Sequence, residues 1–320
     1  MKTILIPGAG FEVSRFCLGC AYYGSRESEE LSFQLLDYYY DHGGRFINTA
    51  HEYGYGKSET TIGKWVKERG VRHEVIVTSK GGEDHTKPHS VAMHREELLE
   101  DIDESLSRTG FDYLDFYNLH LDDETVPVAE IIGTMADIQK SGKIRHYGCS
   151  NWSVERQREA TAYAKAHGIE DFVMDEIEMN LAFKNRPNAT SHIKWLDSDY
   201  VAEHEHDGKA VGGYTAVLHG LLTKFIRDGD TRSWAEWQII PYDNPHNREI
   251  ARRLGKLSAE TGFSPSALQI AWIMNQPHKF PSFAIVGTSK LYQLEDCMAA
   301  ADIELTQEQM DWLHGDDLDY

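Results

Sequence analysis

Apolar segments typical of buried strands end at side chains that can take part in proton transfer. One segment runs into a loop that carries Asn48 and Tyr53. A second ends at Lys80, and a third ends at His120. An ammonium group beside a phenol lowers the phenol pKa, and an imidazole can hydrogen-bond a carbonyl oxygen as it gains charge. A lone Lys, Tyr or His is usually structural, but three at consecutive strand ends predict a site that reduces C=O when hydride is supplied.

Strand-like and helix-like segments, which must position these side chains, alternate along the chain. A turn at Pro7–Gly10 between two short strand-like runs predicts an N-terminal hairpin. The strand-like segments lie near residues 16–20, 46–47, 75–78, 113–119, 144–149, 172–177, 210–217 and 283–286. The helix-like segments lie near residues 29–40, 58–69, 94–107, 128–140, 154–166, 200–206, 248–260, 266–275, 291–300 and 307–313.

This alternation predicts an α/β fold, a (β/α)8 TIM barrel with an N-terminal β-hairpin, formed by residues 1–320 as one domain. The alternative is a doubly wound open sheet. It is disfavoured because Gly8–Gly10 lacks the full dinucleotide fingerprint and no G-x-G-x-x-G opens a helix after the first strand. A long loop is expected over residues 218–244. In such a barrel the active site lies at the C-terminal ends of the strands.

The balance of charge limits the partners that the chain can have. Its 320 residues carry a formal net charge of −20. Nucleic acids and anionic membranes are therefore disfavoured, because binding phosphate needs clustered Lys and Arg. The short apolar run Ile4–Ile6 is broken by Pro7 and Gly8, so we expect no signal peptide and a cytoplasmic location. No run approaches the length of a membrane span.

Four cysteines occur, at Cys17, Cys20, Cys149 and Cys297. Cys17 and Cys20 form a C-x-x-C sequence, which could indicate a redox or metal site. In a strand, however, an odd separation places the two side chains on opposite faces. No second Cys or His pair nearby completes a zinc site. We therefore expect free, mostly buried thiols and no metal.

Motifs in five parts of the chain together resemble those of the aldo-keto reductases. Phe46–Gly54 is similar to the family's D-T-A-x-x-Y-G motif, and Lys57–Glu59 contains the S-E that follows it. Ser141–Asn151 resembles the G-K-I-R…G-x-S-N segment. Pro7–Gly19 resembles the opening hairpin and first strand, and Ile285–Asp296 resembles the dinucleotide-binding close. Each motif alone is weak, but together and in this order they are highly specific.

The resemblance implies a nicotinamide-dependent carbonyl reductase whose cofactor lies extended across the barrel mouth. Tyr53 would donate the proton, Lys80 would tune its pKa, and His120 would orient the carbonyl. Asn48 would complete the catalytic set. The other matched positions would bind the cofactor: Cys20 at the end of the first strand, Ser150, Asn151 and Glu176 at the nicotinamide carboxamide, Tyr214 stacked on the nicotinamide ring, Thr215 toward the pyrophosphate, and Gly287, Ser289, Lys290, Gln293 and Asp296 at the adenosine and phosphate end.

NADP(H) is the preferred cofactor on this reading, with NAD(H) possible. Lys290 is the reason, because a cation can pair with the extra 2′-phosphate. The expected partner is a small carbonyl or sugar-like substrate. Aromatic and histidine side chains on loops expected at the mouth could line its pocket, although loop packing explains each of them equally well: His51, His85, Trp152, His219, Trp234 and Trp237.

Asn48 departs from the family pattern, which has at this position an Asp that pairs with the lysine. The change has opposing effects on proton transfer. An unpaired Lys80 ammonium would stabilise tyrosinate more strongly, yet Lys80 itself would lose its proton more readily. Glu52 and Glu83 are the nearby candidates in sequence for a replacement charge.

Two further departures concern the cofactor. Glu176 stands where Gln is usual, and an ionised carboxylate can accept from the carboxamide NH2 but cannot donate to its C=O. Cys297 replaces a common Asn near the adenine, which removes hydrogen-bonding capacity. These changes keep cofactor binding plausible and place catalytic efficiency in question.

Four hypotheses for the function follow. The first is reduction of an aldehyde or ketone to an alcohol with NADPH. The second is that the same site acts as an NAD(P)+-dependent dehydrogenase and oxidises a sugar or other polyol. A nucleotide-binding scaffold or sensor with weak turnover is favoured by Asn48 and Glu176 but disfavoured by the retained Tyr53, Lys80 and His120. The fourth is unrelated lyase or isomerase chemistry, which would require the resemblance of residues 287–296 to a dinucleotide-binding segment to be a coincidence.

Overall fold

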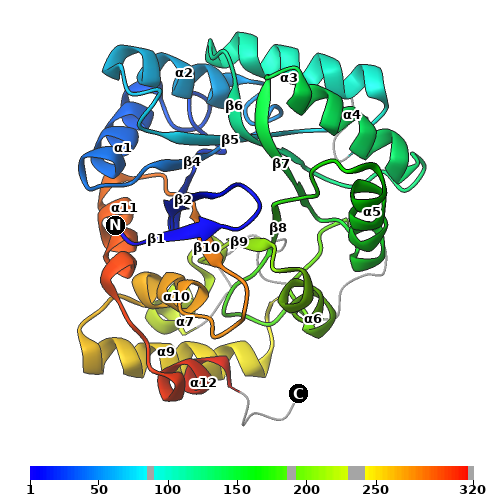
Figure 1. Ribbon diagram of the computed structural model, residues 1–320. Coiled ribbons are helices and arrows are strands. Elements are labelled where there is room, and N and C mark those ends of the chain that lie inside the picture. The colour runs from blue at the N-terminus through cyan, green and yellow to red at the C-terminus, as the bar shows by residue number, and fades with distance from the viewer. Residues whose placement is uncertain (85–89, 186–191, 230–241, 316–320) are drawn as a thin grey trace.

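Eight parallel strands close into a barrel, with helices around it (Figure 1). The computed structural model describes residues 1–84, 90–185, 192–229 and 242–315. Around the barrel the order is β10-β3-β4-β5-β6-β7-β8-β9. The last barrel strand, β10, therefore pairs with the first barrel strand, β3. The strands are β3 (Phe16–Gly19), β4 (Phe46–Asn48), β5 (Ile76–Gly81), β6 (Leu114–Leu119), β7 (Ile144–Ser150), β8 (Met174–Glu178), β9 (Ala210–Tyr214) and β10 (Ser282–Val286).

Amphipathic helices follow the strands and cover the outside of the barrel (Figure 1). Several begin at a residue whose side chain accepts a hydrogen bond from the first turn, as Ser28, Ser153 and Ser264 do. The helices are α1 (Glu29–Asp41), α2 (Lys57–Arg69), α3 (Arg95–Thr109), α4 (Val128–Lys140), α5 (Val154–His167), α6 (Ser198–Asp207), α7 (Leu221–Asp228), α9 (Pro245–Thr261), α10 (Pro265–Met274), α11 (Leu291–Met298) and α12 (Gln307–His314), with 3-10 turns η1 (Leu218–Gly220) and η2 (Ala299–Asp302).

The predicted barrel is confirmed, and its differences from the expected elements are local. The segment 218–244, expected as one long loop, contains η1 and α7, because Leu221, Leu222 and Phe225 supply a buried helical face that packs on α9. β9 ends at Tyr214 rather than at residue 217. β5 continues to Gly81, so Lys80 lies within the strand and not after it.

The predicted N-terminal hairpin closes one end of the barrel. β1 (Thr3–Ile6) pairs antiparallel with β2 (Phe11–Ser14), and in Figure 1 the hairpin lies across the centre of the barrel. Ile6 and Val13 of the hairpin pack in a buried cluster with Phe46, Phe116 and Phe283 of the barrel interior. Because apolar side chains fill this end, the C-terminal ends of the strands are left for polar groups.

On three strands, β4, β6 and β8, the barrel interior changes from apolar to polar within two residues. Phe46, Phe116 and Met174 belong to the apolar cluster against the hairpin. Successive residues of a strand alternate between faces, so the residues two positions later point into the barrel as well. On the same three strands these are Asn48, Asn118 and Glu176, all of them buried. The strand period therefore places a polar layer directly above an apolar one.

The four cysteines are free and buried, as expected. Cys17 belongs to the cluster inside the barrel, whereas Cys20 belongs to the cluster between barrel and helices. The two side chains therefore lie on opposite faces, as the odd spacing predicts. In the part of the chain that the structure describes, the helices are all too short or too polar to span a membrane.

A buried network on the outside of β8 fixes this strand to the helices. Asp175 accepts a hydrogen bond of 2.9 Å from Gln157 of α5 and lies 3.1 Å from Nε2 of His204 of α6. Asp207 lies 3.6 Å from the other ring nitrogen of His204. Burial lowers the pKa of His204, but the hydrogen bond to Asp175 and the nearby carboxylate of Asp207 outweigh it and raise the pKa to about 9. The imidazolium is therefore the main form at neutral pH.

Replacing His204 with Gln is expected to destabilise the protein by about 3 kcal/mol, because Asp175 is left as a buried charge without its cation. A His pKa raised from the usual value of about 6.5 stabilises the fold fully below that pH, and the contribution is lost as the pH rises through about 9. Urea unfolding at pH 6 and pH 10 should therefore give a larger difference at pH 6. The exposed neighbour His206→Gln is the control, and an equal loss in both variants would contradict the prediction.

Candidate active site

Lys80 forms the centre of the polar layer. Its side chain is 3 % exposed. Nζ donates to Oδ1 of Asn48 at 2.7 Å and to the backbone oxygen of Thr49 at 2.9 Å, and it lies 3.2 Å from Oε2 of Glu176. Burial lowers the pKa of Lys80, but Glu176 and Tyr53 outweigh this effect and the pKa is raised. Lys80 is therefore an ammonium group held in place by partners from β4 and β8.

Glu176 supplies the carboxylate that sequence could not locate. The residue is 1 % exposed, and its Oε1 accepts hydrogen bonds of 2.8 Å each from the side-chain amides of Asn48 and Asn118. Glu52 and Glu83, the candidates from sequence, lie beside His120 instead. The charge that pairs with Lys80 therefore comes from β8.

Tyr53 lies next to Lys80 and His120, two other members of the predicted catalytic set. Lys80 Nζ is 5.1 Å from the centre of the Tyr53 ring. The rings of Tyr53 and His120 are 5.5 Å apart and meet edge to face at 77°. Thus the phenol, amine and imidazole gather at the C-terminal ends of neighbouring strands, as predicted from their positions.

The Tyr53 hydroxyl has a raised pKa, contrary to the expectation that the ammonium of Lys80 would lower it. Burial is the largest cause. Lys80 lowers the pKa as expected, but the carboxylates of Glu176, Glu52 and Glu83 raise it and the net shift is upward. A phenol with a raised pKa stays protonated at neutral pH, which suits a proton donor.

His120 follows β6 and is neutral at neutral pH. Burial and the charge of Lys80 lower its pKa to about 4, against the opposing effects of Glu52 and Glu176. Its Nδ1 lies 2.9 Å from Oε1 of Glu83 and 4.0 Å from Oε1 of Glu52. A neutral imidazole keeps one N–H donor and one acceptor, so His120 can orient a polar substrate group without carrying charge.

Ser150, Asn151 and Tyr214 form a second polar group at the ends of β7 and β9. Ser150 Oγ donates to the backbone oxygen of Glu176 at 2.8 Å and accepts from Asn151 Nδ2 at 3.0 Å. The Tyr214 hydroxyl donates to Asn151 Oδ1, which also accepts from the backbone N–H of Lys194 at 3.0 Å. The structure brings these three predicted residues together, while the carboxylate of Glu176 points instead to Lys80. Thr215 follows Tyr214 and is partly exposed.

The loop after β10 carries the residues assigned to the adenosine and phosphate end. Ser289 donates to Oε1 of Gln293 from its backbone N–H at 3.2 Å and from its hydroxyl at 3.3 Å. Lys290 is the exposed N-cap residue of α11, and its side chain makes no cap hydrogen bond. Asp296 accepts a hydrogen bond of 2.8 Å from Ser264. The predicted residues therefore surround the start of one helix.

Among the residues that the structure describes, Gly287 and Thr288 of this loop stand out for a close backbone contact and for an unpaired polar group. Gly287 passes so close to β3 that a Cβ at this position would lie 3.3 Å from the backbone oxygen of Gly19. Within the described residues, the buried hydroxyl of Thr288 has no hydrogen-bond partner. Sequence reasoning did not single out Thr288, although it stands inside the motif Ile285–Lys290. Cys297 is buried on α11, and burial raises its pKa to about 12.

Cys20 stands at the C-terminal end of β3, but its side chain does not face the mouth of the barrel. It is fully buried against the helices, and its thiol donates to the backbone oxygen of Leu18 at 3.5 Å. Its own backbone oxygen accepts from the hydroxyl of Ser58 at 2.7 Å. A contact of the Cys20 side chain with the cofactor is therefore not supported, and the assignment of this position to the cofactor site stays a prediction. Cys20 directly follows β3, and the alternation of the strand turns its side chain outward.

Loop packing explains most of the described candidates for a substrate pocket. His51 is buried and lies 2.9 Å from Glu104. Trp152 is buried, and its indole N–H donates to the backbone oxygen of Leu121 at 2.8 Å. His219 is exposed in η1, close after β9. The other three candidates, His85, Trp234 and Trp237, lie outside the described residues.

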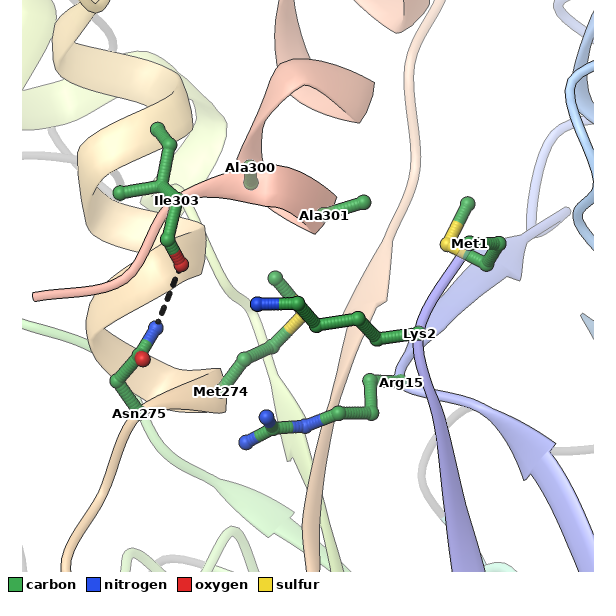
Figure 2. Close-up of a pocket in the computed structure, with 8 residues that line it drawn as sticks. All are labelled: Met1, Lys2, Arg15, Met274, Asn275, Ala300, Ala301 and Ile303. Atoms are coloured by element: carbon green, nitrogen blue, oxygen red, sulfur yellow. Dashed lines mark hydrogen bonds between the residues drawn. The ribbon is translucent and has the colours of Figure 1, made fainter.

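Two hollows lie away from Tyr53, Lys80 and His120. Figure 2 shows the first, where Lys2 and Arg15 extend toward Met274 at the end of α10. Since Arg15 directly precedes β3, this hollow lies at the N-terminal end of the barrel. The second has a volume of about 610 Å³ and lies beside α6, α10 and α12, and its lining includes Trp195, Tyr242, Trp272 and His314. Neither hollow is part of the gathered polar site.

Comparison with known proteins places the chain in a family with this fold. The model of the aldo/keto reductase family matches residues 15–315. Norsolorinic acid reductase B of Aspergillus parasiticus is 28% identical over 96% of this chain and 81% of its own length. The aryl-alcohol dehydrogenase [NADP(+)] of Phanerodontia chrysosporium is 27% identical over 97% of this chain and 84% of its own. Aldo-keto reductase YhdN of Bacillus subtilis is 29% identical over 92% of this chain and 87% of its own.

A solved structure supports the same architecture. A thermostable aldo-keto reductase, crystallised with the inhibitor epalrestat, superposes with a TM-score of 0.76 over 98% of this chain and 99% of its own. Its sequence is 22% identical, so this likeness speaks for the fold alone. With a family model that covers nearly the whole barrel, the chain belongs to the aldo/keto reductase family, whose members are oxidoreductases that reduce carbonyl groups.

Proposed function

We propose that this protein reduces an aldehyde or ketone to an alcohol with NADPH, and that Tyr53 donates the proton. The observation that carries the proposal is the buried ammonium of Lys80, which lies between Tyr53 and a carboxylate at the mouth of the barrel. Burying a charged lysine beside a tyrosine ring costs desolvation free energy, which its partners must offset. A lysine with only a structural role would gain no net stability from such a position.

The residues at the mouth fit a nicotinamide cofactor. Ser150, Asn151 and Tyr214 would hold the nicotinamide, with Thr215 next to the pyrophosphate. The loop after β10 would hold the other end through Gly287, Ser289, Lys290, Gln293 and Asp296, where the buried Thr288 hydroxyl has no partner within the described residues. Bound NADPH would supply hydride to the carbonyl carbon. This family generally uses NADP(H), and one relative carries NADP(+) in its name.

The chain's own residues would handle the proton. As the carbonyl carbon gains hydride, its oxygen gains negative charge and takes the proton of Tyr53. Lys80 would stabilise the tyrosinate that remains, and neutral His120 would orient the oxygen. The raised pKa of Tyr53 keeps the donor protonated in the resting enzyme. This favours reduction over the reverse oxidation, in which Tyr53 would have to begin as a base.

The test is loss of NADPH absorbance with a panel of aromatic, aliphatic and sugar-derived carbonyls. Two relatives are named a norsolorinic acid reductase and an aryl-alcohol dehydrogenase, which leads us to expect the highest turnover with aromatic aldehydes. Turnover only in the direction of NAD(P)+ reduction would favour a sugar or polyol dehydrogenase. Tight NADPH binding without turnover in either direction would favour the scaffold.

Lys290 is expected to set the preference for NADPH. Replacing it with Met should raise the Kd for NADPH about 10-fold, because the 2′-phosphate loses a charged partner, and leave the Kd for NADH within about 2-fold. Fluorescence titration of both cofactors measures this. Lys256→Met, which removes an exposed lysine of α9, is the control. Equal weakening of NADPH and NADH binding would contradict the assignment.

We also propose that residues 1–320 form one barrel domain and that the protein works in the cytoplasm. A single cooperative unfolding transition, seen alike by circular dichroism and tryptophan fluorescence, is the result expected of one domain. Fractionation of cells with an antibody to the protein tests the location, and recovery in the membrane or secreted fraction would contradict it.

A further inference from the structure

The contacts around Lys80 show an exchange of acid and amide between two strands. The family resemblance places an acid at position 48 and an amide at position 176. This chain has Asn48 on β4 and Glu176 on β8, 128 positions apart, and the two side chains are hydrogen-bonded at 2.8 Å. Both contact the ammonium of Lys80, at 2.7 Å and 3.2 Å.

We propose that Glu176 is the counter-ion of Lys80 and a positioning residue for proton transfer by Tyr53, a role that rests on the proposed function. Asn48 then acts as a bridge, because its oxygen accepts from Lys80 while its NH2 donates to Glu176. An amide can do both at once, whereas an ionised carboxylate at this position could only accept. The departures at Asn48 and Glu176 thus belong together, because the exchange keeps one carboxylate to pair with the ammonium of Lys80.

The hydrogen bonds explain why either change alone would be unfavourable. An Asp at position 48 would present a carboxylate oxygen to Glu176 at a distance that now holds a 2.8 Å hydrogen bond. Two carboxylates so close cannot both ionise easily, and one must take up a proton. A Gln at position 176, with Asn48 unchanged, would leave the Lys80 ammonium buried among neutral groups, which is also costly.

The same contacts give Glu176 a role different from binding the nicotinamide carboxamide. Its Oε1 is occupied by the amides of Asn48 and Asn118, and its Oε2 faces Lys80. The carboxylate is 1 % exposed. The carboxamide would then be held by Ser150 and Asn151, and loss of the Glu176 charge should affect proton transfer more than cofactor affinity.

Four proteins test this exchange: wild type, Glu176→Gln, Asn48→Asp and the double variant. Glu176→Gln should lower kcat about 10- to 100-fold and the melting temperature by about 5 °C, and shift the alkaline limb of the kcat profile about one pH unit lower, since Lys80 loses its proton more readily. Asn48→Asp should also lower kcat and the melting temperature, with partial recovery near pH 5, where the carboxylate pair holds a proton. In the double variant, kcat and the melting temperature should both return toward the wild-type values.

The control and a second measurement separate positioning from folding. Glu203→Gln removes another buried carboxylate, which pairs with Arg158 at 2.6 Å on the outside of the barrel. It should lower the melting temperature without moving the alkaline limb. The pKa of Lys80, followed by NMR of 13C-labelled lysine, should fall in Glu176→Gln and recover in the double variant, with no turnover required.

The outcomes distinguish this inference from the proposed function. If the losses of the two single variants simply add in the double variant, or if Glu176→Gln leaves the pKa of Lys80 unchanged, the exchange is refuted. If the thermal and NMR results show recovery in the double variant but wild type reduces no carbonyl with NADPH, the ion pair is supported and the reductase proposal fails.

Discussion

Replacing Tyr53 with Phe is expected to lower kcat by about 10²- to 10⁴-fold, the range for loss of a positioned general acid. The ring that packs against Lys80 and His120 remains in place, and only the hydroxyl is removed. NADPH affinity should therefore change by less than about 2-fold. The measurements are steady-state reduction of an aromatic aldehyde and fluorescence titration with NADPH.

Tyr55→Phe is the matched control for this result. Tyr55 lies two positions along the same loop, but it is 90% exposed. Loss of its hydroxyl should leave kcat unchanged. If Tyr53→Phe keeps more than about a tenth of the wild-type kcat, another group donates the proton and the assignment of Tyr53 fails.

Replacing Lys80 with Met should abolish turnover and lower the free energy of unfolding by about 3–5 kcal/mol, because the carboxylate of Glu176 remains buried without its cation. Adding Glu176→Gln to Lys80→Met should restore most of this stability, since the removed pair is then neutral. It should not restore kcat, because the tyrosinate has no ammonium to stabilise it. Urea unfolding and steady-state kinetics on the two variants measure the two effects separately.

Lys64→Met provides the control for removing a lysine. Lys64 pairs with Glu29 at 2.6 Å on the surface, where such pairs contribute about 1 kcal/mol or less. A loss of stability in Lys80→Met that is no greater than in Lys64→Met would show that Glu176 is not an effective counter-charge. Recovery of kcat in Lys80→Met with Glu176→Gln would contradict a catalytic role for Lys80.

Sequence predicted the features that depend on neighbouring residues. The helix at Val128–Lys140 was predicted with the bounds that the structure has, because its apolar period is regular. The capping box of Thr306 and Gln309 at α12 could be predicted from spacing alone. Tyr53, Lys80 and His120 could be grouped because parallel strands of a barrel end at one face.

Features that depend on distant residues could not be predicted. The partner of Lys80 is Glu176, and the contact depends on the closure of the barrel rather than on any local pattern. The pKa of Tyr53 is the sum of burial, one ammonium and three carboxylates from separate segments, and its direction could not be read from Lys80 alone. Helix α7 was missed because it has only eight residues and directly follows a 3-10 turn.

Transfer of deuterium from NADPH to the product tests the central claim most directly. NADPH that carries deuterium at the transferable position of the nicotinamide would be incubated with an aromatic aldehyde, and the product alcohol analysed by mass spectrometry. The expected product carries deuterium on the former carbonyl carbon in wild type and in Tyr55→Phe, with formation strongly reduced in Tyr53→Phe. Alcohol without deuterium, or equal yields from wild type and Tyr53→Phe, would contradict hydride transfer to a carbonyl with Tyr53 as the proton donor.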